Sequence, residues 1–283
     1  MTKELQKKVD FAIRLLQQAE ISAKSKGQPV EIAYSGGKDS DVLLELAKMA
    51  NIDFRAIYKN TSIDPPYTIK HCKEKEVEIR QPIQTFYELL KKHGYPSRLI
   101  RFCCQHLKEY KILDVCAMGI RKSESKRRNN QYKEPTECKF YGSKKNHVEA
   151  FYPILEWNDQ DIEQFIQERK IKCHPLYYDE KGVFHVERRL GCLCCPMKSR
   201  KQRINDFMKY PNMVKLYIRG GGYYFDSKRF TKNNSQFNNV YEKFVCLLFC
   251  DNLVEFKKKF GENIFNESVD CKKFLEDYFN IKF

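Results

Sequence analysis

The chain has 283 residues, enough for one large domain or for one domain with a smaller appendage. Its 42% hydrophobic and 31% charged residues are ordinary for a soluble globular protein. No apolar run reaches the roughly 18 residues that a membrane helix needs, and residues 1–20 form a charged amphipathic segment without the apolar stretch of a signal peptide. These features exclude a membrane-spanning protein and predict a cytoplasmic one.

The net charge of +15 has two explanations. One is a polyanionic partner such as a nucleic acid, because Lys and Arg attract phosphates to the protein surface. A lysine-rich surface from an AT-biased genome would give the same excess, which is spread along the chain. Composition alone leaves both open.

The first part of the chain alternates helical and strand patterns. Residues 3–26 repeat apolar side chains at helical spacing, and Gly27 ends that segment. Strands that alternate with helices imply right-handed βαβ crossovers and a mostly parallel sheet. The predicted strands are 30–34, 54–58 and 77–79, and the helices between them are 39–49 and 67–75.

The patterns after residue 80 are less regular. We expect helices at 86–94, 104–111 and 159–170, a strand at 114–120 and a mobile charged loop at 121–135. From about residue 200 the alternation stops, and the remainder is helical and aromatic-rich, interrupted by Gly220–Gly222. The chain is therefore predicted to hold an N-terminal helix over 1–27, a sheet-containing domain over 28–200 and a helical region over 201–283.

The segment Ser35-Gly36-Gly37-Lys38-Asp39-Ser40 joins the first predicted strand to a helix. Its two glycines allow a ligand to approach the backbone closely, and the amides of the first helical turn point toward a bound anion. The two serine hydroxyls add donors, and the lysine adds a positive charge. The spacing differs from the Walker loop, which places Gly-Lys-Ser/Thr after a longer glycine loop. The segment therefore predicts a phosphate-binding loop.

This loop resembles the PP-loop of the N-type ATP pyrophosphatases and of the sulfonucleotide (PAPS/APS) reductases. The resemblance covers roughly residues 28–200 and implies a PAPS reductase-like nucleotide-binding domain there. The implied fold is α/β and adenine nucleotide alpha-hydrolase-like (Rossmann-like), with a mostly parallel sheet and helices on both faces, plus a small α-helical C-terminal domain. Further motifs follow in the family's order: Asn60 to Thr68, Arg98 to Lys108 with Cys103-Cys104, Gly119 to Arg127, Tyr152 to Ile162, and His174 to Tyr177.

The resemblance also implies which residues hold the nucleotide, either ATP with Mg²⁺ or PAPS/APS. Asp39 suits a Mg²⁺-mediated contact, Arg121 a bidentate contact with phosphate or sulfate, and Lys108 a point-charge contact. Lys38, Asp39 and Arg121 are also candidate catalytic residues. The full predicted nucleotide-binding set is Ser35, Gly36, Gly37, Lys38, Asp39, Ser40, Asn60, Thr61, Lys108, Gly119 and Arg121.

Two groups of cysteines are clustered among the twelve in the chain, namely Cys103-Cys104 and Cys192-Leu193-Cys194-Cys195. A disulfide framework is not expected in a cytosolic protein, so paired thiolates indicate zinc or an iron–sulfur cluster. Similarity to the iron–sulfur branch of the sulfonucleotide reductases implies a [4Fe–4S] cluster on Cys103, Cys104, Cys192 and Cys195. Cys194 is an extra thiol that either replaces a neighbouring ligand or acts as a free catalytic nucleophile. Cys138 is a further candidate ligand.

One feature of the family is missing. Its reductases attack the sulfate with a cysteine in a C-terminal Glu-Cys-Gly-x-His segment, and the nearest counterpart here, residues 267–273, has Cys271 without the glycine and histidine. Without that nucleophile a reductase has no thiol for its S-sulfo intermediate. We therefore expect an ATP-dependent adenylating sulfurtransferase, resembling enzymes of tRNA thiolation and DNA phosphorothioation, that acts with a thiol or sulfur donor. A divergent phosphoadenylyl/adenylyl-sulfate reductase releasing sulfite and a non-catalytic nucleotide-sensing accessory subunit are the alternatives.

A nucleic-acid substrate is one expected partner, and a protein partner is another. Residues 122–128 and 198–203 are basic and would contact a phosphate backbone, with Tyr223, Tyr224 and Phe225 available for base stacking. The same three aromatic residues would equally pack the helical tail. No membrane contact is expected.

Overall fold

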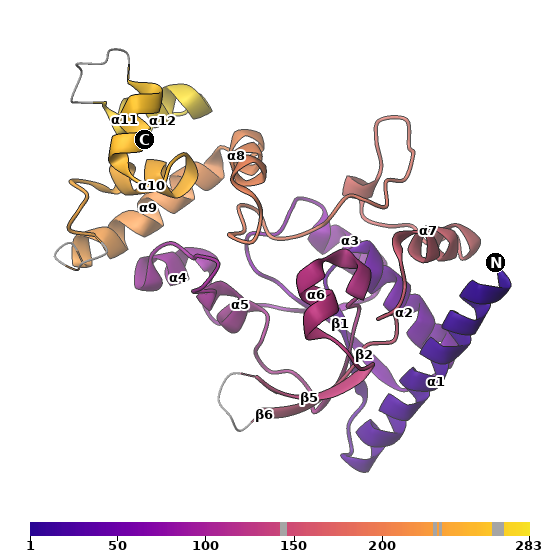
Figure 1. The fold of residues 1–283 in the computed structure, drawn as a ribbon. Helices are drawn as coiled ribbons and strands as arrows, with labels where there is room; N and C mark the ends of the chain where they lie inside the picture. Colours follow the sequence, from indigo (N-terminus) through magenta and orange to yellow (C-terminus); the bar gives the residue numbers. More distant parts are fainter. Residues whose placement is uncertain (142–145, 229–230, 232–233, 262–268) are drawn as a thin grey trace. The chain divides into compact units, whose positions relative to one another are not determined.

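The structure of the protein, a computed structural model, describes residues 1–141, 146–228, 231, 234–261 and 269–283. The chain divides into two units (Figure 1). Unit 1 comprises residues 1–82 and 105–191, and unit 2 comprises residues 83–104 and 192–283. The domain expected over 28–200 stays a prediction, and its residues 83–104 and 192–200 group with the C-terminal helices.

Within the described residues, unit 1 contains a six-stranded sheet with the order β3-β2-β1-β4-β6-β5. All neighbouring pairs are parallel except β5 and β6. Ala33 of β1 lies between Ile57 of β2 and Met118 of β4. The mostly parallel sheet that the sequence predicts is therefore confirmed. The strands are β1 (Val30–Tyr34), β2 (Phe54–Lys59), β3 (Glu78–Arg80), β4 (Val115–Met118), β5 (Thr136–Tyr141) and β6 (Asn146–Phe151).

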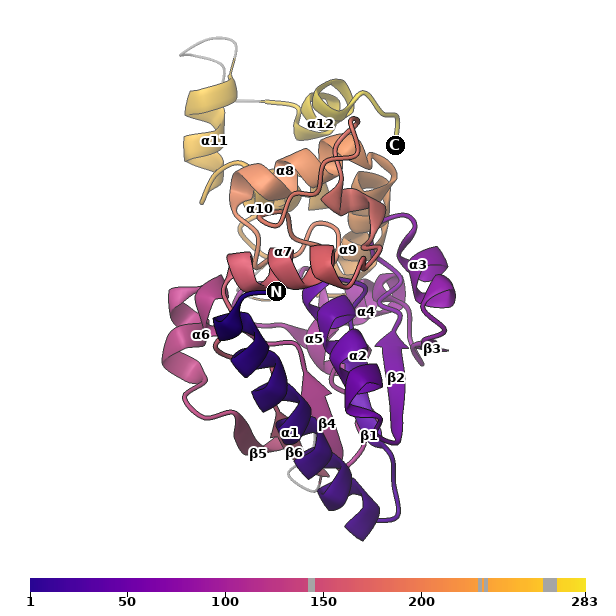
Figure 2. The same ribbon diagram turned by 90° about the vertical axis from the view of Figure 1, so that its right-hand side faces the viewer.

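Helices α1 (Lys3–Ser25) and α2 (Lys38–Ala50) lie side by side across one face of this sheet (Figure 2). α1 begins after Thr2, whose hydroxyl accepts a hydrogen bond from the amide of Leu5 at 3.2 Å. Its buried side chains recur every three or four residues, as a helix with one apolar face requires. Val30 and Ile32 of β1 belong to the same core, whereas Glu31 and Ala33, which alternate with them, line a cleft.

The remaining helices of unit 1 are α3 (Thr68–Glu74), α6 (Lys126–Gln131) and α7 (Asp159–Glu168), with 3₁₀ turns at Lys122–Glu124 and Pro175–Tyr177. Of these helices, α3 and α7 follow the predicted order with shifted ends, whereas α6 was not predicted. α5 (Phe102–Leu107) crosses from unit 2 into unit 1 and is shorter than the helix expected at 104–111.

The mobile loop expected over 121–135 is wrong, because the structure forms a 3₁₀ turn and α6 there. The Ser125 hydroxyl accepts a hydrogen bond from the amide of Arg128 at 3.2 Å, and Arg128 forms an ion pair with Glu124. The sequence of α6 has no apolar period to reveal it, so its stability depends on this cap and ion pair. The antiparallel pair β5–β6 was also not predicted.

Unit 2 is helical and packs through aromatic side chains. Phe207 and Phe244 lie edge to face with ring centroids 5.4 Å apart, and Phe207 lies 5.1 Å from Tyr217 in the same geometry. The helical, aromatic-rich tail that the sequence predicts is therefore confirmed. Its helices are α4 (Phe86–His93), α8 (Arg200–Lys209), α9 (Asn212–Ser227), α10 (Val240–Leu248), α11 (Leu253–Phe260) and α12 (Cys271–Phe279).

α9 runs through Gly220–Gly222 without a break, contrary to the predicted interruption. A Cβ at Gly220 would lie 2.9 Å from Leu90 Cβ, and one at Gly221 would lie 2.4 Å from the ring of Tyr95. These glycines therefore allow α4 and Tyr95 to approach the backbone of α9 closely. None of the described helices is long and apolar enough to span a membrane.

Candidate functional site

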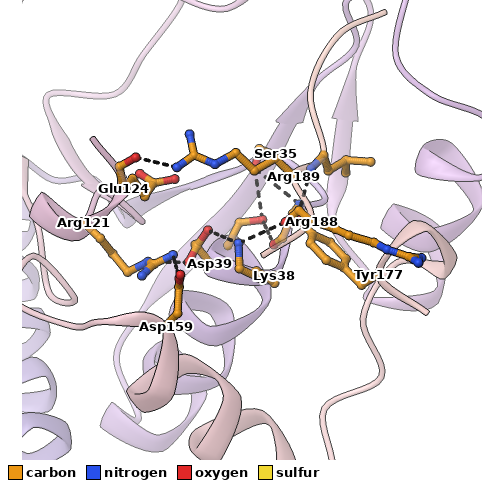
Figure 3. A network of polar contacts seen from close by, with 12 residues as sticks. Ser35, Lys38, Asp39, Arg121, Glu124, Asp159, Tyr177, Arg188 and Arg189 are labelled. Carbon is orange, nitrogen blue, oxygen red and sulfur yellow. Dashed lines mark hydrogen bonds and ion pairs between the residues drawn. The ribbon is translucent and has the colours of Figure 1, made fainter. Parts of the chain in front are cut away.

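The predicted phosphate-binding loop joins the end of β1 to the beginning of α2 (Figure 3). Gly36 has a φ of +78°, in the left-handed region that favours glycine. Gly37 is the N-cap of α2, and no side chain caps this helix. The Ser40 hydroxyl donates a hydrogen bond to the Gly37 carbonyl at 2.7 Å and thereby closes the turn. The loop has the backbone geometry of an anion site at a helix N-terminus.

Lys38 is nearly buried between its neighbour Asp39 and a segment from later in unit 1 (Figure 3). Its Nζ lies 3.4 Å from Asp39 Oδ2 and 3.5 Å from the carbonyl oxygen of Arg188, and 5.4 Å from the centre of the Tyr177 ring. The ammonium group is therefore oriented by a carboxylate, a carbonyl and an aromatic face.

Arg121 is also buried, with 1% of its surface exposed, and it divides its guanidinium group between two carboxylates. Nε lies 2.7 Å from Asp39 Oδ1, and Nη2 lies 2.9 Å from Asp159 Oδ1. Nη1 donates to the Ser123 hydroxyl at 3.0 Å. In this structure Arg121 fixes the orientation of Asp39, and the phosphate contact expected for it stays a prediction.

Tyr177 and residues 188–190 lie against the loop, a contact that the sequence did not predict. The Tyr177 hydroxyl accepts a hydrogen bond from the Leu190 amide at 3.2 Å, and its oxygen is also near the backbone amide of Lys38. A Cβ at Gly37 would lie 3.2 Å from the same hydroxyl oxygen. The only sequence signal for this contact is the His174–Tyr177 motif. It follows the family's motif order, but it does not indicate that Tyr177 lies against the loop.

A cleft of about 390 Å³ opens on the sheet face opposite α1 and α2. Ser35, Lys108 and Gly119 of the predicted nucleotide-binding set line it, together with Arg128, which was predicted to contact a nucleic-acid backbone and not the nucleotide. Its volume lies in the range of small-molecule sites. A Cβ at Gly119 would lie 3.0 Å from the Asp39 carbonyl oxygen, so this glycine allows β4 to approach the first turn of α2.

Two further predicted residues, Asn60 and Thr61, follow β2 and are engaged in local hydrogen bonds. Asn60 Nδ2 donates to Gln81 Oε1 at 2.8 Å, and the Thr61 amide donates to Asp64 Oδ2 at 2.9 Å. Because β1 and β2 are parallel, this segment leaves the sheet at the same edge as the loop. Neither residue lines the cleft, whereas Asp64 does.

A buried polar network lies at the first turns of α2. The Tyr34 hydroxyl donates to Asp41 Oδ1 at 2.5 Å, and His71 Nε2 lies 3.0 Å from the same oxygen. Burial, followed by the charge of Asp41, raises the pKa of Tyr34. Since these residues come from β1, α2 and α3, the network ties the helix N-terminus to the sheet.

The four predicted cluster ligands all lie in unit 2. A hydrogen bond with Cys104, burial, and the charges of Cys104, Cys192 and Cys195 raise the pKa of Cys103. These thiols are therefore close enough to influence one another, and their chemistry fits the donor set of an iron–sulfur cluster or zinc. No group of three or more His, Cys, Asp or Glu in the described part of the chain has the arrangement of a metal site, so the ligand set stays a prediction.

The other candidate thiols have different surroundings. Cys194 is fully buried, and burial followed by the charge of Asp206 raises its pKa. Burial likewise raises the pKa of Cys271 to about 11. Both thiols are thus held protonated, which does not favour a nucleophile. Cys138 is exposed on β5 of unit 1.

The aromatic residues considered for base stacking are mostly packed. Phe225 is buried, and Tyr224 lies against Gly94, whose added Cβ would be 2.7 Å from its ring. Tyr223 is exposed. Two of the three side chains therefore pack within unit 2.

Comparison with known proteins gives both sequence relatives and structural neighbours. Two uncharacterized proteins of Methanocaldococcus jannaschii are 27% and 29% identical over 69% and 60% of this chain. The chain spans 48% and 36% of their lengths, about half or less of the curated relatives it matches.

Two solved structures show a partial similarity to this chain. A phosphoadenylyl-sulfate (PAPS) reductase from Candida auris has a TM-score of 0.44 and 16% identity, covering 68% of this chain and 96% of that one. An FMN adenylyltransferase from Candida glabrata has a TM-score of 0.42 and 15% identity, covering 62% and 58%. Likenesses of this strength establish no shared activity.

The sequence itself is decisive for the family. Residues 29–198, more than half of the chain, match the phosphoadenosine phosphosulfate reductase domain. That range contains the loop between β1 and α2, the two clustered cysteine pairs and the Tyr177 segment. The chain therefore belongs to the phosphoadenosine phosphosulfate reductase domain family.

Proposed function

We propose that the protein is a PP-loop enzyme that binds ATP with Mg²⁺ and adenylates an oxygen of its substrate, which a sulfur nucleophile then replaces. The observation that carries this proposal is the loop between β1 and α2, with its uncapped helix N-terminus, its oriented Lys38, and Ser35 in the lining of a cleft of about 390 Å³. This arrangement suits the phosphates of a nucleotide.

The Tyr177 hydroxyl supports this assignment. It accepts a hydrogen bond from the Leu190 amide and is near the Lys38 amide. A phosphate oxygen in the same position would meet the same two backbone amides. We propose that the hydroxyl stands in for a phosphate oxygen, and that nucleotide binding exchanges one for the other at the Lys38 amide.

Asp39 is the proposed contact for Mg²⁺. One of its oxygens faces Arg121, the other faces Lys38, and its side chain is 16% exposed. A carboxylate held from two sides loses little freedom when a cation binds, so the ion pairs would prepare it for a metal–nucleotide complex. In this proposal Arg121 acts through Asp39.

The proposed reaction has two balanced steps. The substrate oxygen attacks the α-phosphorus of ATP, the bond to the β,γ-phosphates breaks, and pyrophosphate leaves with the electron pair. A sulfide-level sulfur then attacks the activated centre and displaces AMP, which retains the substrate oxygen. No electrons are gained or lost, so the reaction needs a sulfur donor but no separate reductant.

The thiols of unit 2 would bind the iron–sulfur cluster that the family's iron–sulfur branch implies. Cys103, Cys104, Cys192 and Cys195 would be its ligands, because these are the thiols whose charges act on Cys103. A bound cluster would supply a site that holds inorganic sulfur. The proposed substrate class is a nucleic acid, in keeping with the net charge of +15.

Anaerobic incubation with ATP, PAPS or APS, each with a thiol reductant that can supply the two electrons of sulfate reduction, tests the reaction directly, with AMP, pyrophosphate and sulfite as the readouts. The proposal predicts AMP and pyrophosphate from ATP, increased by nucleic acid. Sulfite from PAPS or APS would identify a reductase instead. Turnover of none of the three nucleotides, with or without nucleic acid, would favour a nucleotide-sensing subunit.

A second experiment tests the cluster. Anaerobically purified protein should be coloured and contain iron, and Cys195→Ser should lose most of both because a cluster ligand is removed. Cys246→Ser is the matched control, since Cys246 is a buried thiol of α10 in the same unit. Colourless, iron-free wild-type protein, or equal iron in both variants, would remove the cluster from the proposal.

A further inference from the structure

Unit 2 contains a basic pocket beside the loop of clustered cysteines. Its volume is about 410 Å³, and Pro196, which directly follows Cys195, forms part of its lining. The cationic side chains in that lining are Arg98, Lys198, Arg200 and Arg203. The pocket lies within one unit. Three of its cations, Lys198, Arg200 and Arg203, belong to the segment 198–203 that the sequence predicts to contact a phosphate backbone, and the nucleotide reaction proposed above does not use them.

Arg203 is the least exposed of these cations, with 9% of its surface accessible. Nη1 donates to the Leu247 carbonyl at 3.4 Å, whereas Nε has no hydrogen-bond partner among the described residues. Burial lowers the pKa of Arg203, and the nearby groups that oppose this effect are Tyr217, Cys194 and Cys195. A buried guanidinium without a carboxylate partner is costly, and an anion bound from outside would offset that cost.

The other cations differ in their partners. Lys198 forms an ion pair with Asp206 at 2.7 Å, and Arg200 forms one with Asp251. Arg98 contacts only carbonyl oxygens in the described structure, those of Pro196 at 3.3 Å and of Lys198 at 3.4 Å. Among the residues that the structure describes, neither Arg98 nor Arg203 therefore pairs with a carboxylate.

We propose that this pocket binds a phosphate-class oxyanion, held by Arg203 and Arg98 beside the loop that contains Cys192 and Cys195. Guanidinium groups match such anions through paired N–H donors, and a buried one loses little solvation when the anion arrives. The oxyanion has two sources of the same chemistry, free inorganic phosphate or a phosphodiester of a nucleic-acid backbone. Binding at this pocket does not depend on the proposed nucleotide reaction.

Hydrogen–deuterium exchange of the full chain locates the binding. Inorganic phosphate and a short single-stranded oligonucleotide are added separately, and exchange is followed in peptides covering 196–205. The proposal predicts slower exchange there with at least one of the two probes. Peptides covering 35–42 report separately on the phosphate-binding loop, so a failure at one site is distinguished from a failure at the other. Protection by phosphate would identify free phosphate as the ligand of the pocket. Protection by the oligonucleotide alone would identify a phosphodiester of the nucleic-acid backbone.

Arg203→Gln should raise the probe concentration for half-maximal protection by about tenfold or more, because it removes a charge-assisted contact. Arg219→Gln is the matched control, since Arg219 is exposed on α9 of the same unit. Should Arg203→Gln not fold, Arg98→Gln tests the exposed side of the pocket with the same expected direction. Absence of protection with both probes, or unchanged protection in the foldable pocket variants, overturns the proposal.

Discussion

His174 shows how one buried side chain can make the stability of unit 1 depend on pH. It is 1% exposed, and its Nε2 lies 3.1 Å from the Pro66 carbonyl, so this nitrogen bears the hydrogen. Nδ1 accepts the amide hydrogen bond of Leu176 at 3.1 Å. The ring is thus satisfied only when neutral, and burial followed by the charge of His71 lowers its pKa.

The lowered pKa of His174 determines the direction in which stability changes with pH. Below about pH 6.5 an unfolded histidine takes up a proton, whereas the folded ring stays neutral. The free energy of unfolding therefore decreases as the pH is lowered, until the pH is below the pKa of the folded ring. We predict that His174→Asn, which keeps an acceptor for the Leu176 amide without titrating, reduces this slope by up to about 1.4 kcal/mol per pH unit. Urea unfolding at a series of pH values measures it. An identical slope in the variant would show that His174 does not titrate on unfolding.

Arg121 and Lys38 show why residue roles were harder to predict than residue positions. The sequence placed both cations near the loop, and both are there. It did not reveal that Arg121 is paired with Asp39 and Asp159, because these partners come from different elements of unit 1. Ion pairs between distant segments leave no local pattern in a sequence.

At the scale of elements, the closeness of β4 to α2 depends on Gly119. A Cβ there would lie 3.0 Å from the Asp39 carbonyl oxygen and 3.2 Å from its carbon, both backbone atoms. We predict that Gly119→Ala lowers the free energy of unfolding by about 1–3 kcal/mol and weakens nucleotide binding, because the first turn of α2 must move. Gly191→Ala is the control, since an added Cβ there would point into open space. Equal stability of the two variants would contradict the close packing.

The glycines of α9 provide a matched pair in unit 2. Gly221→Ala would place its Cβ 2.4 Å from the Tyr95 ring, whereas Gly222→Ala would meet only Val240 Cγ1 at 3.9 Å. We predict that Gly221→Ala is destabilising and that Gly222→Ala is stabilising by about 0.5–1 kcal/mol, the difference in helix propensity. Thermal unfolding of both variants, compared with wild type, measures whether each substitution raises or lowers the stability. A loss of stability in Gly222→Ala would contradict a continuous helix.

Elements with strong periodicity were predicted well, and those without it were not. α1 and α2 end within two residues of their predicted bounds, because apolar spacing and Gly27 define them. β5 has charged residues among its apolar ones, and α6 is polar throughout, so neither shows a buried face in the sequence. Pairing with β6 and the Ser125 cap determine these two elements instead.

For the whole molecule, the sequence predicted the sheet and the family but not the division of the chain. Residues 83–104 interrupt the sheet-containing part in sequence and belong with the C-terminal helices in space. This grouping places Cys103 and Cys104 in the same unit as Cys192 and Cys195. Such long-range grouping results from aromatic packing across α4, α9 and α10, which local patterns do not specify.

The central claim is that the loop between β1 and α2 binds the phosphates of an adenine nucleotide. Isothermal titration of ATP with Mg²⁺ into wild-type protein, Lys38→Met and Lys48→Met tests it most directly. Lys48 is exposed on the same helix, and methionine keeps the aliphatic part of either side chain. The account predicts that Lys38→Met binds about tenfold more weakly or worse, because a charge-assisted contact is lost, while Lys48→Met binds like wild type. Equal affinity of Lys38→Met and wild type, with both folded, would contradict it.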